Sequence, residues 1–311
     1  MTSVAVFGEM LVDLFDSGPV VGGAPFNVAR HLAALGHAPL MLSAVGQDAQ
    51  ANQVLAELAR YGMAREGVQV LPDQATGVVD VTTRPDRSHA FHIREACAWD
   101  VVAMEPARAA LRALAAGGWL YSGTLALRSP VSRATGLALM RQHAGPRFLD
   151  LNWREGHVPR DVALQALQRA QVLKVNDEEL AMLCGWLGHA VPAATDAAAV
   201  QRSARHVLGQ LPLQTLLVTC GPEGALAFDA SGQCVARGAP ARAVQLVDTV
   251  GAGDAFSAVV LAGLLRGWPL ADTLDRATAF AGHVCEVRGA VPADLAAYAR
   301  WTADWPKPAM V

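Results

Sequence analysis

Residues 248–258 read Asp-Thr-Val-Gly-Ala-Gly-Asp-Ala-Phe-Ser-Ala and combine features suited to phosphoryl transfer. The small residues Gly251, Ala252 and Gly253 precede Asp254 and an apolar run with helical spacing. Small residues let a ligand approach the backbone closely, and the N–H groups at a helix start form an anion site. A carboxylate beside that site repels phosphate unless it has a proton to accept, so Asp254 is a candidate general base for an attacking hydroxyl. The alternative is a glycine turn followed by an aspartate that only interacts favourably with the helix dipole.

Two common phosphate-binding devices are missing from the sequence. The chain has two lysines, Lys174 and Lys307, and neither follows a glycine. A P-loop requires a glycine–lysine pair and is therefore excluded. The glycine-rich segment also fails as a dinucleotide fingerprint, because Phe256 stands where the third small residue is needed. Phosphate chemistry in this chain must use another device, and a nucleotide-binding oxidoreductase is a disfavoured alternative.

The composition is that of a globular protein without an extended charged surface. Of 311 residues, 52% are hydrophobic and 17% are charged, and the formal net charge is −3. Without a basic cluster, nucleic acid and anionic membranes are poor partners. The five cysteines lie far apart and form no Cys-x-x-Cys pair, which argues against a disulfide framework or a zinc site. The N-terminus lacks a signal-peptide pattern, and no apolar run approaches the roughly 20 residues of a membrane span. These features predict a cytoplasmic protein with no membrane partner.

Short apolar runs alternate with helical patterns along the chain. Strand-like runs occupy residues 3–8, 39–46, 117–123, 147–152, 171–176 and 214–221. Helical patterns occupy residues 25–36, 49–62, 129–144, 161–170, 176–184 and 193–209. This alternation predicts an α/β fold, a doubly wound and mainly parallel sheet with helices on both faces. No linker-like composition interrupts the chain, so residues 1–311 are predicted to form a single domain.

Residues 76–94 break this alternation. Apolar and polar residues alternate there on both sides of a Pro-Asp-Arg-Ser turn, which is typical of a solvent-facing hairpin. We therefore expect a small β flap that projects from the main sheet.

Two further segments place polar residues at the ends of expected elements. Asp13 is expected to end the first strand, where parallel sheets bind ligands, and a loop aspartate is the alternative. Asn176 and Glu179 are three residues apart at a helix start. From the residues alone, a capping arrangement is the favoured interpretation of this pair.

Two motifs resemble the ribokinase-like, or PfkB, family of ATP-dependent sugar kinases. Residues 248–258 resemble the family's C-terminal signature, and residues 22–36, which begin Gly-Gly-Ala-Pro-Phe-Asn, resemble its N-terminal sugar-binding stretch. The resemblance extends over essentially the whole chain. It implies a doubly wound α/β fold with a small β lid. It also implies that Asp254 is the catalytic base and that the amides of residues 251–253 form the anion hole.

The lid of such a kinase is expected at residues 12–24 and 74–98. Only eight residues separate Asp13 from Gly22, fewer than in many relatives. A hairpin within them would have about three residues per strand, with Gly18 and Pro19 in the turn. We therefore expect a reduced lid built mainly from the 76–94 hairpin, and a monomer or a homodimer formed elsewhere.

The resemblance also implies binding roles for individual residues. The sugar is expected at Asp13, Gly22, Gly23 and Asn27. Asn176 and Glu179 would act near Mg²⁺ and the ATP phosphates, through water. The remaining implied sites are a nucleotide site at Thr219, Gly221, Gly224 and Thr278, the last of which stands where the family often has asparagine, and a monovalent cation site (K⁺) at the backbone of Asp248, Val250 and Gly289.

Two segments indicate a branch of the family. Residues 150–154 and 121–127 look like stretches shared by fructokinases and 2-keto-3-deoxygluconate kinases. Arg154, together with Arg94 after the flap strand, would bind a keto acid bidentately or order sugar hydroxyls and phosphate, unless each is an exposed loop arginine. We expect transfer of the ATP γ-phosphate to a primary hydroxyl of fructose. The alternatives are a 2-keto-3-deoxygluconate kinase, another sugar or nucleoside kinase of the family, and a catalytically silent sugar-binding regulator on the same fold.

Overall fold

The chain forms two compact units. The computed structural model describes residues 4–83, 89–112, 114, 117–193, 196–240 and 245–306. The first unit comprises residues 1–29 and 38–169, and the second comprises residues 30–37 and 170–311. The single domain over residues 1–311 stays a prediction. Within the described part of the chain, no helix is both long and apolar enough to cross a membrane.

The first unit alternates strands with helices. Its elements in chain order are β1 (Val4–Phe7), β2 (Leu11–Phe15), β3 (Gly18–Gly22), α1 (Ala24–Ala34, which continues into the second unit), β4 (Leu40–Val45), α2 (Ala49–Arg60), β5 (Val68–Val70), β6 (Gly77–Thr83), β7 (His89–Ile93), η1 (Ala98–Val101), α3 (Met104–Arg112), β8 (Trp119–Ser122), η2 (Leu125–Leu127), α4 (Pro130–Gln142), β9 (Arg147–Asp150) and α5 (Arg160–Leu167).

The main sheet of the first unit is parallel. Its strands lie in the order β9-β8-β1-β4-β5. In the central strand β1, Val6 pairs with Met41 of β4 and with Tyr121 of β8. Every residue of β1 is buried, as expected for a parallel strand covered on both faces. The apolar runs that predicted β1, β4, β8 and β9 are therefore the buried strands of this sheet.

A smaller sheet in the first unit has the strand order β3-β2-β6-β7. It contains the predicted flap hairpin, because β6 and β7 are antiparallel and Val81 pairs with Phe91. The predicted turn of this hairpin, residues 85–88, lies outside the described residues. β2 joins β6 in parallel, so the hairpin does not stand alone.

Two expectations about residues 11–22 are wrong. β2 and β3 form an antiparallel hairpin with five residues in each strand, because β2 begins before Asp13 and β3 continues to Gly22. Gly18 and Pro19 belong to β3 rather than to the turn. Asp13 also does not end the first strand, since β1 ends at Phe7 and Asp13 lies within β2. The lid segments thus form a sheet, and it is not reduced to one hairpin.

The second unit contains the remaining elements. In chain order they are β10 (Val172–Asn176), α6 (Asp177–Trp186), α7 (Ala197–Leu208), β11 (Thr215–Thr219), η3 (Gly221–Glu223), β12 (Ala225–Asp229), β13 (Cys234–Gly238), α8 (Ala252–Arg266), α9 (Leu270–Cys285) and α10 (Ala296–Trp301).

Strands of the second unit lie in the order β10-β11-β12-β13. β10 and β11 are parallel, whereas β12 and β13 are added antiparallel at the edge. Helices α6 and α7 pack on β10, β11 and β12, while α9 packs on β12 and β13 and also on α8. Each unit therefore carries parallel strands flanked by helices, and the first also carries a smaller sheet. This confirms the predicted α/β class.

Every predicted strand-like run contains a strand, namely β1, β4, β8, β9, β10 and β11. The apolar run that precedes Thr249 forms no strand over residues 245–248, and residues 241–244 lie outside the described residues. The backbone N–H groups of Val247 and Asp248 instead donate to the carbonyl of Cys285, at the end of α9. The segment before α8 is thus held by a helix end.

An aromatic cluster forms part of the core of the second unit. Phe280 of α9 lies edge-on to His31 and to Trp301, with ring centroids 5.5 Å and 5.4 Å apart. The hydroxyl of Tyr298 lies 2.8 Å from Nδ1 of His31, which is fully buried. Burial lowers the pKa of His31 to about 3, and the positive charge of Arg30 acts in the same direction. His31 is therefore neutral in the folded protein at neutral pH.

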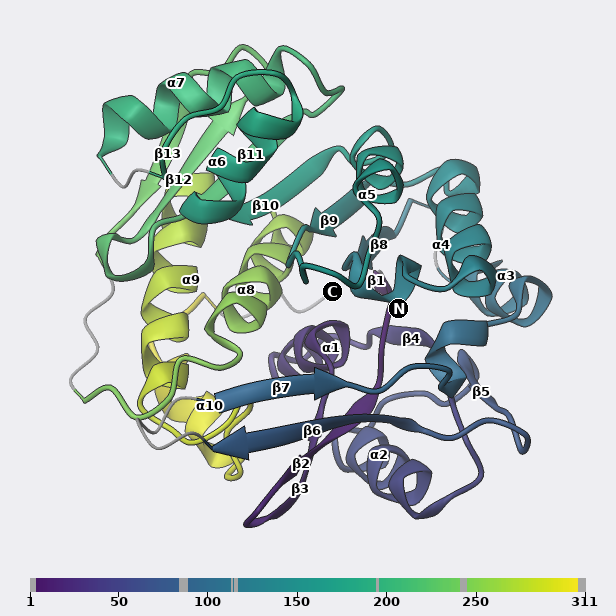
Figure 1. Cartoon of the computed structure of the whole chain (residues 1–311). Helices are drawn as coiled ribbons and strands as arrows, with labels where there is room; N and C mark the ends of the chain where they lie inside the picture. The colour runs from purple at the N-terminus through teal and green to yellow at the C-terminus, as the bar shows by residue number, and fades with distance from the viewer. Residues whose placement is uncertain are drawn as a thin grey trace. The chain divides into compact units, whose positions relative to one another are not determined.

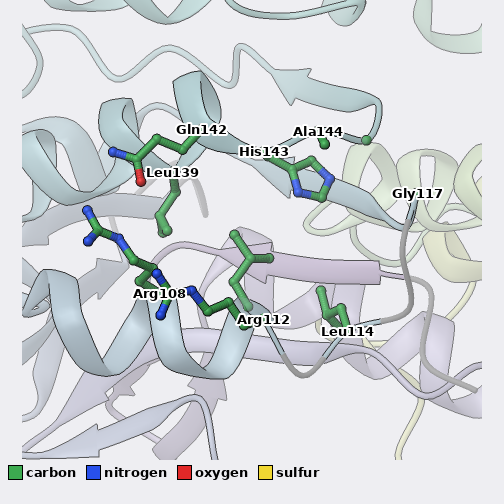
Figure 2. Close-up of a pocket in the computed structure, with 10 residues that line it drawn as sticks. Arg108, Arg112, Leu114, Gly117, Leu139, Gln142, His143 and Ala144 are labelled. Carbon is green, nitrogen blue, oxygen red and sulfur yellow. The ribbon is translucent and has the colours of Figure 1, made fainter.

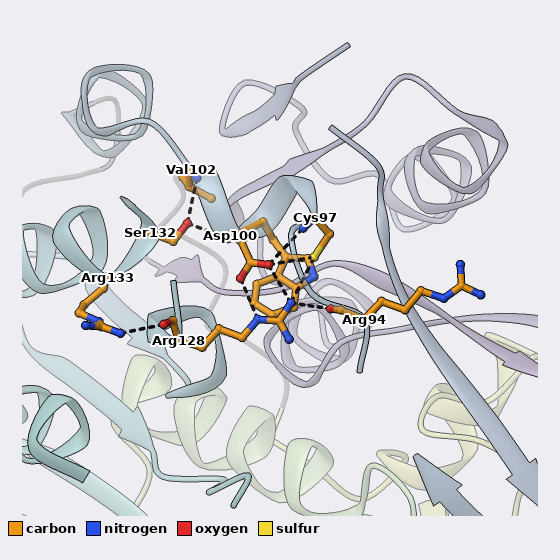
Figure 3. A network of polar contacts seen from close by, with 8 residues as sticks. Arg94, Cys97, Asp100, Val102, Arg128, Ser132 and Arg133 are labelled. Carbon is orange, nitrogen blue, oxygen red and sulfur yellow. Dashed lines mark hydrogen bonds and ion pairs between the residues drawn. The ribbon is translucent and has the colours of Figure 1, made fainter. Parts of the chain in front are cut away.

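A buried ion pair binds the segment that follows β7 of the smaller sheet (Figure 3). Arg128, after η2, donates from Nε and Nη2 to the Asp100 carboxylate of η1 over 2.8 Å and 2.7 Å. Nη2 of Arg128 also donates to the carbonyl of Arg94, the residue that follows β7. The guanidinium lies 4.0 Å from the ring centroid of Trp99. The segment that follows β7 is therefore hydrogen-bonded to an ion pair whose two side chains are buried.

Replacing Arg128 by methionine should strongly destabilise the protein. The Asp100 carboxylate would stay buried without its guanidinium, and removing one partner of a buried pair costs about 3–5 kcal/mol. Arg60→Met is the matched control, because Arg60 pairs with Glu57 at the surface and such pairs contribute about 1 kcal/mol or less. Urea unfolding of both variants measures the difference. Equal losses in the two variants would contradict the importance of the buried pair.

The protein should lose stability in mild acid through His31. The unfolded chain binds a proton on this histidine near its usual pKa of about 6.5, whereas the folded chain excludes the proton until the pH falls to about 3. The free energy of unfolding should therefore fall as pH decreases below about 6.5, by roughly 2 kcal/mol for this residue at about pH 5. Urea unfolding at both ends of that range should show a smaller acid loss in His31→Gln than in the wild type. Identical acid losses would show that His31 does not titrate in this way.

Candidate active site

The predicted anion loop lies directly before α8 in the second unit. Gly251 adopts a left-handed conformation with φ +81°, and its carbonyl accepts the N–H of Ala255. A Cβ atom on Gly251 would lie 2.4 Å from the Cα of Ala290, so only glycine fits this position. The loop therefore turns into α8 with the first-turn N–H groups at its start, as an anion site requires.

Asp254 and Lys174 bring opposite charges to this loop. Asp254 lies in the first turn of α8 and is largely buried. Lys174 of β10 is also buried, and its Nζ lies 2.9 Å from the position that a Cβ atom would take on Gly253. An ammonium group therefore lies against the anion loop. Sequence reasoning missed this residue, although it is one of only two lysines and lies two residues before Asn176.

Asn176 and Glu179 form the capping arrangement that the residues alone suggest. Oδ1 of Asn176 accepts the N–H of Glu179 over 2.7 Å, and Oε2 of Glu179 accepts the N–H of Asn176 over 2.9 Å. The parallel register pairs Asn176 with Thr219, so these two predicted residues lie at the carboxyl ends of neighbouring strands. Parallel sheets bind ligands at this edge.

The other predicted nucleotide residues follow β11. Gly221 begins the short η3 turn, and Gly224 follows it. A Cβ atom on Gly224 would lie 2.5 Å from the carbonyl oxygen of Gly238, and one on Gly238 would lie 2.9 Å from Cγ2 of Thr278. Gly224 and Thr278 therefore pack on the same residue of β13. The hydroxyl of Thr278 donates to the carbonyl of Asp275 within α9.

The predicted cation residues are joined by one carboxylate. Oδ1 of Asp248 accepts the N–H of Val250 over 3.0 Å, and Oδ2 accepts the N–H of Gly289 over 3.0 Å. The loop before α8 and the loop after α9 are therefore connected at Asp248 and again where Gly251 contacts Ala290. The sequence indicated the backbone of these residues, whereas the Asp248 side chain makes the connection.

The predicted sugar residues gather in the first unit at the start of α1. A Cβ atom on Gly22 would lie 2.3 Å from Oδ2 of Asp13, so the Asp13 carboxylate lies against this glycine. A Cβ atom on Gly23 would lie 2.5 Å from the carbonyl oxygen of Glu9. The carbonyl of Gly23 accepts the N–H of Asn27 over 2.8 Å. Asp13, Gly22, Gly23 and Asn27 are thus brought together around β2, β3 and α1.

Arg94 is not brought to this cluster. Asp13 pairs with Val79, which pairs with Ile93, so these three side chains share one face of the smaller sheet. Arg94 follows Ile93 and forms an exposed bidentate ion pair with Asp80, which lies on the opposite face from Val79. Arg154 is exposed on the loop after β9.

A separate cavity opens in the first unit near the amino ends of β8 and β9 (Figure 2). It has a volume of about 440 Å³, and α3 and α4 line it with Arg108, Arg112, Leu139 and Gln142. His143 lies at its edge and contacts the carbonyl oxygen of Gly118. No predicted site residue lines this cavity, and it is at the edge of the sheet opposite to the one where parallel strands bind ligands.

Comparison with known proteins gives the family. Residues 1–296 match the pfkB family of carbohydrate kinases. The fructokinase of Klebsiella pneumoniae is 31% identical over 283 residues, which cover 83% of this chain and 83% of that protein. The chain therefore belongs to the pfkB family of carbohydrate kinases.

Solved structures share the fold. A fructokinase from Xylella fastidiosa with bound ATP has a TM-score of 0.81 at 23% identity and covers 98% of this chain and 99% of its own. A double mutant of the Vibrio cholerae O395 fructokinase, with fructose, ADP and a potassium ion bound, has a TM-score of 0.76 at 23% identity and covers 97% and 98%. Family membership makes this chain a sugar phosphotransferase, with fructokinases among its relatives.

Proposed function

We propose that the chain is an ATP-dependent fructokinase in which Asp254 is the catalytic base. The observation that carries the proposal is the buried Asp254 at the start of α8, beside the loop of Gly251 and the ammonium of Lys174. The fructokinase relative at 31% identity supports fructose as the sugar. ATP-bound and ADP-bound neighbours of the same fold support the nucleotide.

In the proposed reaction, a primary hydroxyl of the sugar attacks the γ-phosphorus of ATP in line. Asp254 accepts the proton of that hydroxyl as the new O–P bond forms and the bond to ADP breaks. Negative charge spreads over the transferring group, and the amides of residues 251–253 and the ammonium of Lys174 offset it. A protein contributes to phosphoryl transfer mainly by holding such donors in position before the reaction occurs.

The proposed nucleotide site uses the carboxyl ends of β10 and β11, with Thr219, Gly221, Gly224 and Thr278 as the nucleotide contacts. Mg²⁺ would neutralise phosphate charge when bound with ATP. Asn176 and Glu179 each use one oxygen for the other's N–H, and no cluster of three acidic, histidine or cysteine side chains that could hold a metal occurs among the described residues. These residues therefore fit a Mg²⁺ ion held through water better than direct ligands.

A monovalent cation is proposed at the loops joined by Asp248. Its carboxylate orders the backbone of Val250 and Gly289, and carbonyl oxygens of such loops are suitable ligands for a hard cation. The potassium ion of the Vibrio cholerae fructokinase supports K⁺.

The sugar is proposed to bind at Asp13, Gly22, Gly23 and Asn27. The Asp13 carboxylate can accept hydrogen bonds from sugar hydroxyls, and the Asn27 amide can both donate and accept. Arg94 would have to leave Asp80 to reach a substrate, whereas Arg154 is exposed and has no ion pair among those found in the described residues. Arg154 is therefore the better candidate for a contact that distinguishes fructose from 2-keto-3-deoxygluconate, the substrate of the alternative proposal.

Asp254→Asn should retain sugar and ATP binding and lose most turnover. The amide has the same shape but cannot accept the proton, and loss of a general base costs about 10²–10⁴-fold in kcat. Asp272→Asn is a matched control, because Asp272 is also a first-turn aspartate, in α9. Coupled ADP-release kinetics and calorimetric ATP binding give the two readouts. Retention of more than half of kcat in Asp254→Asn would overturn the base assignment, and absence of turnover in the wild type would favour the silent regulator.

Wild-type kcat/KM should be higher for fructose than for 2-keto-3-deoxygluconate. If the substrate is neutral, Arg154→Lys should have a small effect, since no bidentate carboxylate contact is lost. With a carboxylate substrate, the loss should be about tenfold or more. A panel of sugars and sugar acids, assayed with both proteins, measures this. A preference for the keto acid with a large Arg154→Lys effect would replace fructokinase by keto-deoxygluconate kinase.

A further inference from the structure

His31 makes two hydrogen bonds inside the second unit. Its Nε2 lies 3.0 Å from the carbonyl oxygen of Ala290, and its Nδ1 lies 2.8 Å from the hydroxyl of Tyr298. A carbonyl can only accept, so Nε2 carries the proton and donates to Ala290. Nδ1 then has a lone pair and accepts from Tyr298. The Ala290 carbonyl thereby selects the tautomer, and the Tyr298 hydroxyl matches it by donating to Nδ1.

Ala290 is the residue on which the anion loop rests. Its Cα lies 2.4 Å from the position of a Cβ atom on Gly251, which is direct backbone packing. One residue earlier, Gly289 donates its N–H to Asp248. The two loops are in contact at two points, between Gly289 and Asp248 and between Ala290 and Gly251. A shift of residues 289–290 would therefore move the start of α8.

We infer that His31 is a positioning residue for phosphoryl transfer, which holds residues 289–290 against Gly251 through its bond to Ala290 and is itself oriented by Tyr298. No reacting atom touches it, so it acts through the loop. The kinetic part of this inference rests on the proposed kinase function, whereas the order of the loop does not.

The environment of His31 fits this role better than a role in packing alone. The side chain is fully buried against the ring of Phe280, where an apolar residue would avoid the cost of burying two ring nitrogens. Both nitrogens have partners with good geometry, and those partners are 259 and 267 residues away in the sequence. Burial, with the charge of Arg30, lowers the pKa of His31 to about 3, so the ring is neutral at neutral pH and Nδ1 keeps the lone pair that accepts from Tyr298.

The inference can be tested with three variants and one control. His31→Leu removes both bonds, His31→Gln keeps an amide donor near the Nε2 position, and Tyr298→Phe removes only the hydroxyl that donates to Nδ1 and orients the ring. His206→Leu is the control, because Nε2 of His206 also contacts a backbone carbonyl of the second unit, that of Leu187. Amide hydrogen exchange of the free proteins is measured over residues 248–254 and 287–292. Kinetics with fructose, ATP and K⁺ are measured in parallel.

In His31→Leu we expect faster exchange in both segments, with kcat reduced about tenfold or more and KM for fructose within about twofold, as for a contribution made in the transition state. The K⁺ concentration for half-activation should rise. His31→Gln should restore most of kcat and of the protection, Tyr298→Phe should lie between, and His206→Leu should match the wild type.

Unchanged exchange and kcat in His31→Leu would overturn the inference, as would a loss in His31→Gln equal to that in His31→Leu. If His31→Leu does not fold, Tyr298→Phe decides, and wild-type exchange and kcat in that variant would overturn the inference that an oriented His31 holds the loop. If the wild type phosphorylates no sugar, the proposed function fails, and the exchange data alone judge whether His31 holds the loop.

Discussion

The start of α8 depends on the close contact between Gly251 and Ala290. Because a side chain at position 251 would overlap the backbone of residue 290, the chain can turn into the helix there only with glycine. The same contact fixes the position of the first-turn N–H groups and of Asp254. Asp248 adds a second connection between the two loops, and His31 forms a hydrogen bond with the carbonyl of Ala290. The proposed chemistry thus depends on packing between segments about 40 residues apart.

Much of the fold could be predicted because buried parallel strands are apolar runs. β1, β4 and β8 to β11 have this character, and helices such as α2 begin at recognisable caps, here Asp48. The strand bounds of β2 and β3 could not be predicted, because polar Asp13 and the turn-forming Gly18 and Pro19 lie inside strands. Pairing with β6 stabilises β2 there, and a partner that distant leaves no local signal.

The geometry of the candidate site was predictable only where contiguous residues form it. The loop of Gly251 to Asp254 and the Asn176–Glu179 pair are local patterns whose geometry follows from helix starts. Lys174, Arg128 and His31 act on residues far along the chain, so neither spacing nor periodicity indicates them. Lys174 and His31 share one signal, a polar side chain inside a mainly apolar element, which sequence reasoning should weigh more heavily. Such a group must find a partner when the protein folds.

A general base beside a phosphate site raises an electrostatic problem, since its carboxylate repels the group that it helps to transfer. P-loop enzymes place a lysine within the phosphate loop itself. This chain has no lysine there, and its loop is built from small residues that keep the backbone accessible. Lys174 instead approaches Gly253 from the adjacent strand β10, on a rigid element of the sheet. A side chain at Gly253 would overlap that ammonium, so the glycine serves two purposes. In the proposed mechanism it allows the phosphate to reach the backbone, and it leaves room for the positive charge that offsets the repulsion by Asp254.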